Sequence, residues 1–195
     1  MEYRLIVKKY ESAALKINLY AYFETFFIIF AVGNFKKPMA KASIKTVAST
    51  ETACIFSLCF EGESFTEFEK FVMKHKTHYS KELNVILAAI NRMLEVSGFL
   101  ERYFRPEGKM RDNVCALPIT SGKLRLYCLR MSDSILIAGN GGVKNTKKYQ
   151  DSEELNGYVI SLQNLEDAIQ VAVKKGEVTI EEHTINNIDN KTFDV

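Results

Sequence analysis

The sequence predicts an α+β fold, an antiparallel β-sheet with a packed helical hairpin, on three observations. Apolar and polar side chains alternate over residues 124–131, and an apolar run covers residues 135–138 after a Ser-Asp turn, as in a β-hairpin. Apolar residues recur at three- and four-residue spacing between residues 65 and 94, as in two amphipathic helices. The order of elements is one strand, two helices and then at least three strands.

Composition limits the class of protein. The chain has 195 residues, 47% of them hydrophobic, which suits one globular domain or a domain with a large extension. Its most apolar stretch, residues 19–32, contains Glu24 and Thr25 and is too short and too polar to span a bilayer, so we expect no membrane association. The start of the chain lacks the pattern of a signal peptide. Four cysteines lie in apolar runs without CxxC pairing and indicate reduced thiols in a cytoplasmic protein: Cys54, Cys59, Cys115 and Cys128.

Residues 1–52 form a predicted N-terminal β-rich extension. The stretches 2–9, 15–23 and 26–32 alternate weakly or are rich in Ile, Tyr and Phe, which favours two or three antiparallel strands. The aromatic residues have two interpretations, packing within a sheet or a platform on which bases stack, and we favour packing.

The helical hairpin is predicted to follow a strand at residues 53–60. Ser64 and Glu67 have the spacing of a capping box, so the first helix should begin there. The second helix should start near Ser80 and end before Gly98.

The β-hairpin has a predicted register. A two-residue turn pairs Tyr127 with Ala138 and Arg125 with Asn140. One face then carries Leu126, Cys128, Ile135 and Ile137, and the other carries Lys123, Arg125, Tyr127 and Asn140. We therefore expect one buried face and one exposed face that is available for function.

Beyond the hairpin, a turn is predicted at Asn156-Gly157, followed by a helix that Ser161 caps and Gly176 ends. Residues 177–195 read as an acidic tail whose last stretch is disordered.

Charge is distributed unevenly along the chain. Residues 101–148 contain ten Lys or Arg and four Asp or Glu, whereas residues 149–195 contain three and ten. A basic stretch of this kind suits a phosphate-bearing partner, or it is a solvated surface. One hypothesis is that the acidic tail covers the basic face.

The order of elements, with LRLYCLR at residues 124–130 and ILIAGNGGVKNTKKY at residues 135–149, resembles the RelE/ParE superfamily of bacterial toxins, in its HigB-like branch. The resemblance covers about residues 53–170 and implies a toxin domain at residues 53–176. It implies a toxin of a type II toxin–antitoxin system that cleaves mRNA, on or off the ribosome, without a metal or other cofactor. It also implies a partner antitoxin, expected to carry a helix-turn-helix, that holds the toxin inactive.

RNA cleavage by attack of its own 2′-OH needs a base, cations around the phosphorus and an acid for the 5′ oxygen. Basic and phenolic side chains can supply these, because crowded cations lower one another's pKa values. We predict five catalytic residues: Arg125 and Lys144 at the scissile phosphate, Tyr127 stacking on a base or orienting the leaving oxygen, and Lys109 and Arg111 as base or acid and as backbone contacts. Four others are predicted to hold RNA: Arg105, Arg130, Lys147 and Lys148, of which strict alternation puts Arg130 on the core face.

Two features depart from the family pattern or leave its function open. Many HigB-like relatives carry His at the site, but this chain has none between residues 79 and 182, so Lys or a carboxylate replaces the imidazole or the activity is absent. The ParE branch acts on DNA gyrase, so the alternative function is a non-catalytic module that binds a protein target such as gyrase or an antitoxin complex. The N-terminal extension has three open roles: extending the sheet, forming a homodimer contact, or docking an antitoxin.

Two other patterns have simple explanations. His75 and His78 lie three residues apart but lack further residues at metal-ligand spacing, which favours a helix end over a metal site. Gly139, Gly141 and Gly142 lack the GK[ST] ending of a phosphate-binding loop and indicate tight backbone packing instead.

Overall fold

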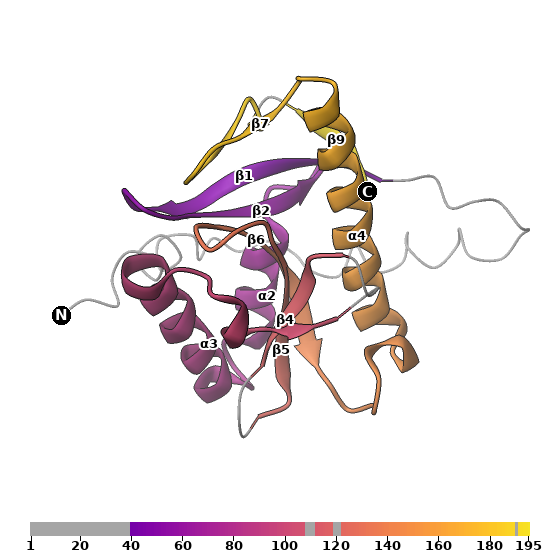
Figure 1. Cartoon of the computed structure of the whole chain (residues 1–195). Coiled ribbons are helices and arrows are strands. Elements are labelled where there is room, and N and C mark those ends of the chain that lie inside the picture. The colour runs from indigo at the N-terminus through magenta and orange to yellow at the C-terminus, as the bar shows by residue number, and fades with distance from the viewer. Residues whose placement is uncertain (1–39, 108–111, 119–121, 190) are drawn as a thin grey trace, which may run out of the picture. The chain divides into compact units, whose positions relative to one another are not determined.

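A seven-stranded sheet organises this computed structural model, which describes residues 40–107, 112–118, 122–189 and 191–195 (Figure 1). Its strands are β1 (Lys41–Ser49), β2 (Cys54–Phe60), β3 (Arg105–Pro106), β4 (Val114–Pro118), β5 (Leu124–Arg130), β6 (Ile135–Val143) and β9 (Thr192–Asp194), in the order β3-β4-β5-β6-β2-β1-β9. Neighbouring strands are antiparallel except β2 and β6, which are parallel. The α+β class is confirmed, and the expectation of a wholly antiparallel sheet is wrong at this one pair.

The predicted helical hairpin is confirmed. Helix α2 (Glu67–His75) is followed by α3 (Ser80–Arg92), a π-helical turn (Met93–Ser97) and Gly98, whose φ of 70° ends the segment. The capping box lies two residues later than predicted: the Thr66 hydroxyl accepts from the Glu69 amide at 3.2 Å, and the Glu69 carboxylate accepts from the Thr66 amide at 2.8 Å. Among the described residues, no helix combines the length and apolarity needed to cross a membrane.

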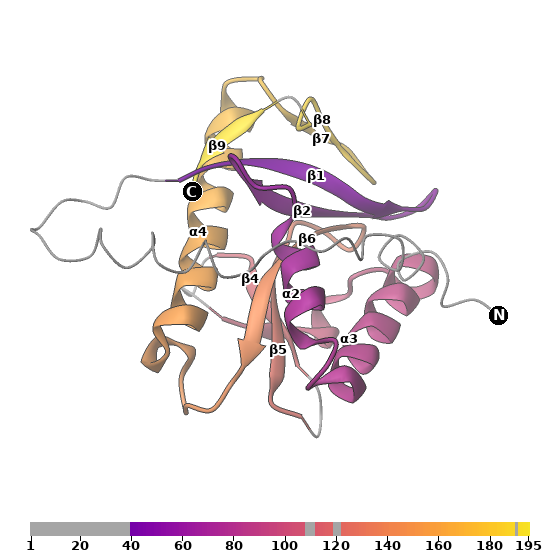
Figure 2. The same cartoon turned by 180° about the vertical axis from the view of Figure 1, so that it is seen from behind.

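Helices cover both faces of the sheet (Figures 1 and 2). On one face, α2 and α3 bury Phe68, Phe71 and Ile86 against the strands. On the other, α4 (Glu153–Lys174) buries side chains such as Leu162 and Ile169. Every strand from β4 to β6 therefore has apolar side chains on both sides, as in a central sheet layer.

Helix α4 begins eight residues before its predicted cap. The Ser152 hydroxyl accepts from the Leu155 amide at 3.4 Å, so Ser152 and not Ser161 caps the helix. The predicted turn at Asn156-Gly157 is wrong, because both residues lie inside α4. Gly176, with a φ of 70°, follows the helix as predicted.

The C-terminal segment is ordered where it is described, contrary to the predicted disordered tail. A small hairpin of β7 (Thr179–Ile180) and β8 (Ile185–Asn186) follows α4, and then β9 pairs with β1 and buries Phe193. Strands β6, β2 and β1 lie between β9 and β5 in the sheet, and the Ser134 hydroxyl of the β5–β6 turn donates to the Glu182 carbonyl. Strand β1 pairs along its length with β2, although it lies in the stretch assigned to the extension; the strands predicted before it lie outside the described residues.

The β5–β6 register differs from the prediction. The turn contains three residues, because the Met131 amide donates to the Ile135 carbonyl at 3.0 Å, and this moves the pairing by one residue. A β-bulge then moves it again: Cys128 pairs with Ala138, but Leu126 pairs with Gly141. Tyr127 therefore lies opposite two residues of β6.

The bulge requires glycine at position 141. A Cβ atom there would lie 2.0 Å from the Arg125 carbonyl oxygen, whereas a Cβ on Gly157, in α4, would meet nothing within 4 Å.

We predict that Gly141→Ala lowers the free energy of unfolding by about 1–3 kcal/mol, because a backbone clash cannot relax by rotating a side chain. Gly157→Ala should raise it by about 0.5–1 kcal/mol, because alanine is the better helix former. Urea unfolding of both variants measures these two changes in the free energy of unfolding. Equal stability of the two variants would contradict the register described here.

Candidate functional site

The bulge in β6 brings two predicted site residues onto one face of the sheet. Before the bulge, Ile135 and Ile137 face α4; after it, a Cβ on Gly142 would meet Leu155 of α4 at 3.0 Å. The bulge has thus shifted the alternation of β6 by one residue. Lys144, two residues after Gly142, therefore shares the α4 face with Arg125.

Arg125 and Lys144 lie at the same end of the sheet. Arg125 is half-buried, and its guanidinium donates to the carbonyl oxygens of Gly122 and Leu124, both at 2.8 Å. Its strand partner is Gly142, and the Lys144 amide donates to the Lys123 carbonyl at 2.9 Å. This end of β5 is also fixed from α3, because the Glu82 carboxylate accepts from the Leu124 amide at 2.7 Å.

The positive charges of this group also act on Glu107, a residue that the sequence analysis missed. Its amide extends the β3–β4 pairing by donating to the Val114 carbonyl at 3.0 Å, and the side chain is half-buried. Burial raises the pKa of its carboxyl, although the positive charges of Lys144, Arg125 and Arg105 oppose that rise. The sequence did contain a signal for this residue, because Glu107 is the one acidic residue between Arg102 and Arg111.

Tyr127 is fully buried, so its predicted exposure on a working face is wrong. Helix α4 and the segment before it cover that face, and the ring of Tyr127 packs edge-on against Tyr149, with 6.2 Å between centroids. Its hydroxyl has no hydrogen-bond partner within the described part of the chain. Burial, with the nearby charge of Glu107, raises the pKa of this phenol, so it keeps its proton.

The remaining predicted site residues differ in their exposure and contacts. Arg105, Lys147 and Lys148 are exposed, Arg105 on β3 and the two lysines in the segment after β6. Arg130 lies at the far end of β5 from Arg125; it donates to the Phe99 carbonyl, pairs with Asp133 and lines a pocket at the β3–β4 edge. Lys109 and Arg111 lie outside the described residues.

The charges of Arg105, Arg125 and Lys144 thus all act on the Glu107 carboxyl, and the charge of Glu107 acts in turn on the buried Tyr127 hydroxyl. We refer to these five residues as the Glu107 site. The described residues contain no group of three His, Cys, Asp or Glu side chains that could hold a metal ion.

No protein-family model, curated protein or solved structure matches this chain. The assignment of function therefore depends on the residues of the site and their surroundings.

His75 supports the same end of the sheet from the opposite face. The ring is 3% exposed, packs against Phe71 and Tyr79, and hydrogen-bonds to the backbone of Gly141. Its Nε2 atom has no partner among the residues that the structure describes. Burial, helped by the charge of Lys74, lowers the pKa of His75 below its ordinary value of 6.5.

This shift predicts that the protein loses stability in mild acid. Below pH 6.5 the unfolded chain binds a proton at His75 that the folded chain refuses, so the free energy of unfolding should fall by up to about 1.4 kcal/mol per pH unit until the folded pKa is reached. His75→Gln should remove that part of the pH dependence. Urea unfolding of both proteins between pH 5 and 8 measures this dependence. Parallel curves of unfolding free energy against pH would show that His75 does not contribute to it.

Proposed function

We propose that this chain is a toxin of the RelE/ParE type, a metal-independent endoribonuclease that cleaves mRNA and is held inactive by an antitoxin. The observation that carries the proposal is the Glu107 site, where a half-buried carboxyl with a raised pKa lies within the field of three cationic side chains. A residue whose pKa is perturbed by burial and by specific neighbouring charges is a candidate for an acid–base role in an active site.

The residues of the site suit attack by the 2′-OH of RNA. Glu107 takes the proton from the 2′-OH, whose oxygen then forms a bond to phosphorus. Arg125 and Lys144 stabilise the negative charge that grows on the phosphoryl oxygens. The bond from phosphorus to the 5′ oxygen breaks, and Lys144 supplies a proton to that oxygen. The products are a 2′,3′-cyclic phosphate and a free 5′-hydroxyl.

Glu107 replaces the histidine that many HigB-like relatives carry. Its raised pKa favours a base that gains and loses a proton closer to neutrality than an exposed carboxylate does. Tyr127 is sealed under α4 and does not stack on a base in this structure; its protonated hydroxyl can donate a hydrogen bond within the site.

The order of elements also supports the proposal. One strand, β2, leads into the α2–α3 hairpin and then into the β4-β5-β6 meander, which is the order that the resemblance implies. An order of elements is shared by many functions, so the proposal depends on the site.

Further lysines lie at the same end of the sheet. The α2–α3 turn, the start of β5 and the segment after β6 meet there in both views (Figures 1 and 2). Contacts of Glu82 with Leu124 and of His75 with Gly141 agree with this arrangement. The exposed lysines of these segments are Lys76, Lys81, Lys123, Lys147 and Lys148. Such a basic surface suits the backbone of a single-stranded RNA.

We predict that induction of the chain in bacterial cells arrests growth and cuts transcripts, leaving 5′-hydroxyl ends. Glu107→Gln, Arg125→Ala and Lys144→Ala should each lower cleavage by about 10²-fold or more, because each removes a group used in the transition state. With the wild-type protein in vitro, kcat/KM should rise with pH through the raised pKa of Glu107, and Glu107→Gln should lose this rise. A chelator should leave the rate unchanged.

The matched control is Lys175→Ala, an exposed cation at the other end of α4. It should cleave like the wild type. Growth arrest with intact transcripts would reject the nuclease and favour the alternative, a module that binds a protein target such as gyrase.

We also predict that Lys76→Glu with Lys81→Glu weakens RNA binding by the cleavage-deficient Glu107→Gln protein. The slope of log affinity against log salt should decrease by about 0.7 for each phosphate that the protein no longer neutralises. Lys174→Glu with Lys175→Glu makes the same change in net charge away from the site and should leave the slope unchanged. Equal slopes for both pairs would show that the α2–α3 turn does not touch RNA.

A further inference from the structure

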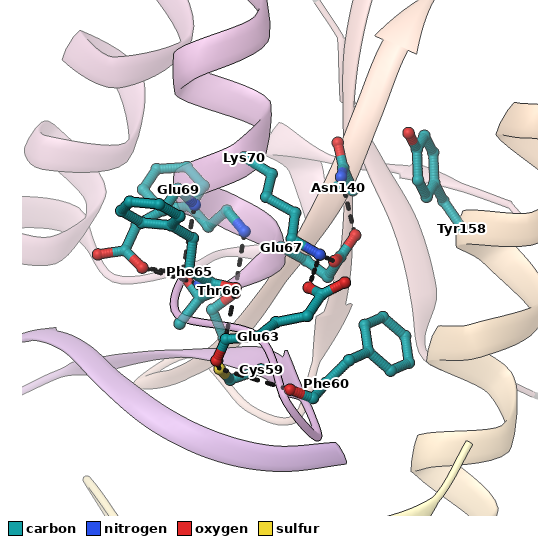
Figure 3. Close-up of polar contacts among 12 residues, drawn as sticks. Cys59, Phe60, Glu63, Phe65, Thr66, Glu67, Glu69, Lys70, Asn140 and Tyr158 are labelled. Atoms are coloured by element: carbon teal, nitrogen blue, oxygen red, sulfur yellow. Dashed lines mark hydrogen bonds and ion pairs between the residues drawn. The ribbon is translucent and has the colours of Figure 1, made fainter. Parts of the chain in front are cut away.

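A buried polar group lies behind the Glu107 site, on the opposite face of the sheet. One member is Asn140, the bulge residue of β6, which is 6% exposed. Figure 3 shows its side chain joined to Glu67. The side-chain nitrogen of Asn140 donates to the Glu67 carboxylate at 2.8 Å, and its side-chain oxygen accepts from the Gly141 amide at 2.7 Å. The two bonds fix the orientation of the Asn140 amide, because only the nitrogen donates and only the oxygen accepts.

Glu67 is held in turn by Lys70. The Lys70 ammonium donates to Glu67 at 2.7 Å and pairs with Glu63, and Figure 3 shows these side chains converging where α2 starts. Glu67 is only 7% exposed, and burying a carboxylate is costly without such partners. Its position beside Asn140 thus depends on contacts from α2.

These contacts act on the part of the backbone that carries Arg125 and Lys144. Strand β2 pairs with β6 only as far as Ala138, so beyond that residue the backbone of β6 has no strand partner on this side among the described residues. Asn140 satisfies the Gly141 amide there, and His75 of α2 bonds to the Gly141 backbone. Both contacts stabilise the bulge that turns Lys144 onto the face of Arg125.

We propose that Asn140 and Glu67 are positioning residues: they hold the β6 bulge so that Lys144 and Arg125 point to the same side of the sheet. This inference deepens the proposed function and rests on it for its catalytic consequence. Neither side chain touches substrate. Both act through the backbone of β6.

The first test reverses the polarity of the Asn140–Glu67 hydrogen bond. Asn140→Asp keeps the shape of the side chain but sets a carboxylate against Glu67, so it should lower kcat on an oligoribonucleotide by about 10- to 100-fold, with KM changed by less than about threefold. Adding Glu67→Gln supplies a donor to the new carboxylate and keeps one carboxylate in the pair. The double variant should therefore return to within about threefold of the wild-type kcat. A double variant as slow as Asn140→Asp would overturn the proposal.

The second test separates positioning from general destabilisation. In a Lys144→Ala background, Asn140→Asp should lower kcat by less than about a further threefold. The reason is that Asn140 acts by positioning Lys144, and that lysine is already absent. If the kcat losses of Lys144→Ala and Asn140→Asp instead multiply in the double variant, the proposal is overturned. Ile169→Ala, a buried change near the other end of α4, is the stability control and should lower the melting temperature without changing kcat at temperatures where it is folded.

A third test does not need activity and so separates failure of this proposal from failure of the proposed function. Arg125 and Lys144 are diagonal neighbours, so their Cα atoms should lie about 7–8 Å apart on one face. Cysteines at both positions should be bridged by a short thiol cross-linker, since the four native cysteines are buried. Asn140→Asp should reduce bridging at least about fivefold, and the Glu67→Gln addition should restore it. Unchanged bridging would refute the positioning role even in a protein that cuts no RNA.

Discussion

The close approach of Gly141 to the Arg125 carbonyl is the constraint on which the rest of this site depends. A glycine is the one residue that lets β6 pass so near β5, and the bulge beside it shifts the alternation of β6 by one residue. Without that shift, Lys144 would point toward α2 and α3, and Arg125 would have no cationic neighbour on β6. A local irregularity in pairing therefore decides which charges meet.

Helices on both faces explain why the groups of the proposed site lie at the end of the sheet. The middle of β5 carries Tyr127 under α4 and Cys128 under α2 and α3, so neither face of the meander is open to a polymer. Burial raises the pKa of the Cys128 thiol well above its usual range, which makes it an inert core group. Charged side chains reach water only beyond the covered part, where the strands end and the connecting segments begin.

The sequence predicted more of the fold than of the site, because its decisive signals were local. The helical hairpin followed from apolar spacing and the meander from alternation, whereas the parallel pairing of β2 with β6 joins segments about 80 residues apart and no local pattern encodes it. Arg125 and Lys144 were chosen by residue type, but their shared face depends on a three-residue turn and a bulge that the sequence did not reveal. Tyr127 was misplaced because α4 was predicted to be shorter. Glu107 was overlooked because a single carboxyl in a basic stretch suggests nothing until its cationic neighbours are known in space.

Glu67 is buried and Glu107 is half-buried, and their different neighbours suit these two carboxyls to different roles. Burial raises the pKa of both Glu67 and Glu107. Glu67 has its two oxygens occupied by Asn140 and Lys70, so adding a proton to either oxygen would disturb the hydrogen bond made there, and the group suits a structural task. Glu107 is influenced by three cations at longer range, and no hydrogen bond to its carboxylate joins the described residues. For this reason we propose the acid–base role for Glu107 and the positioning role for Glu67.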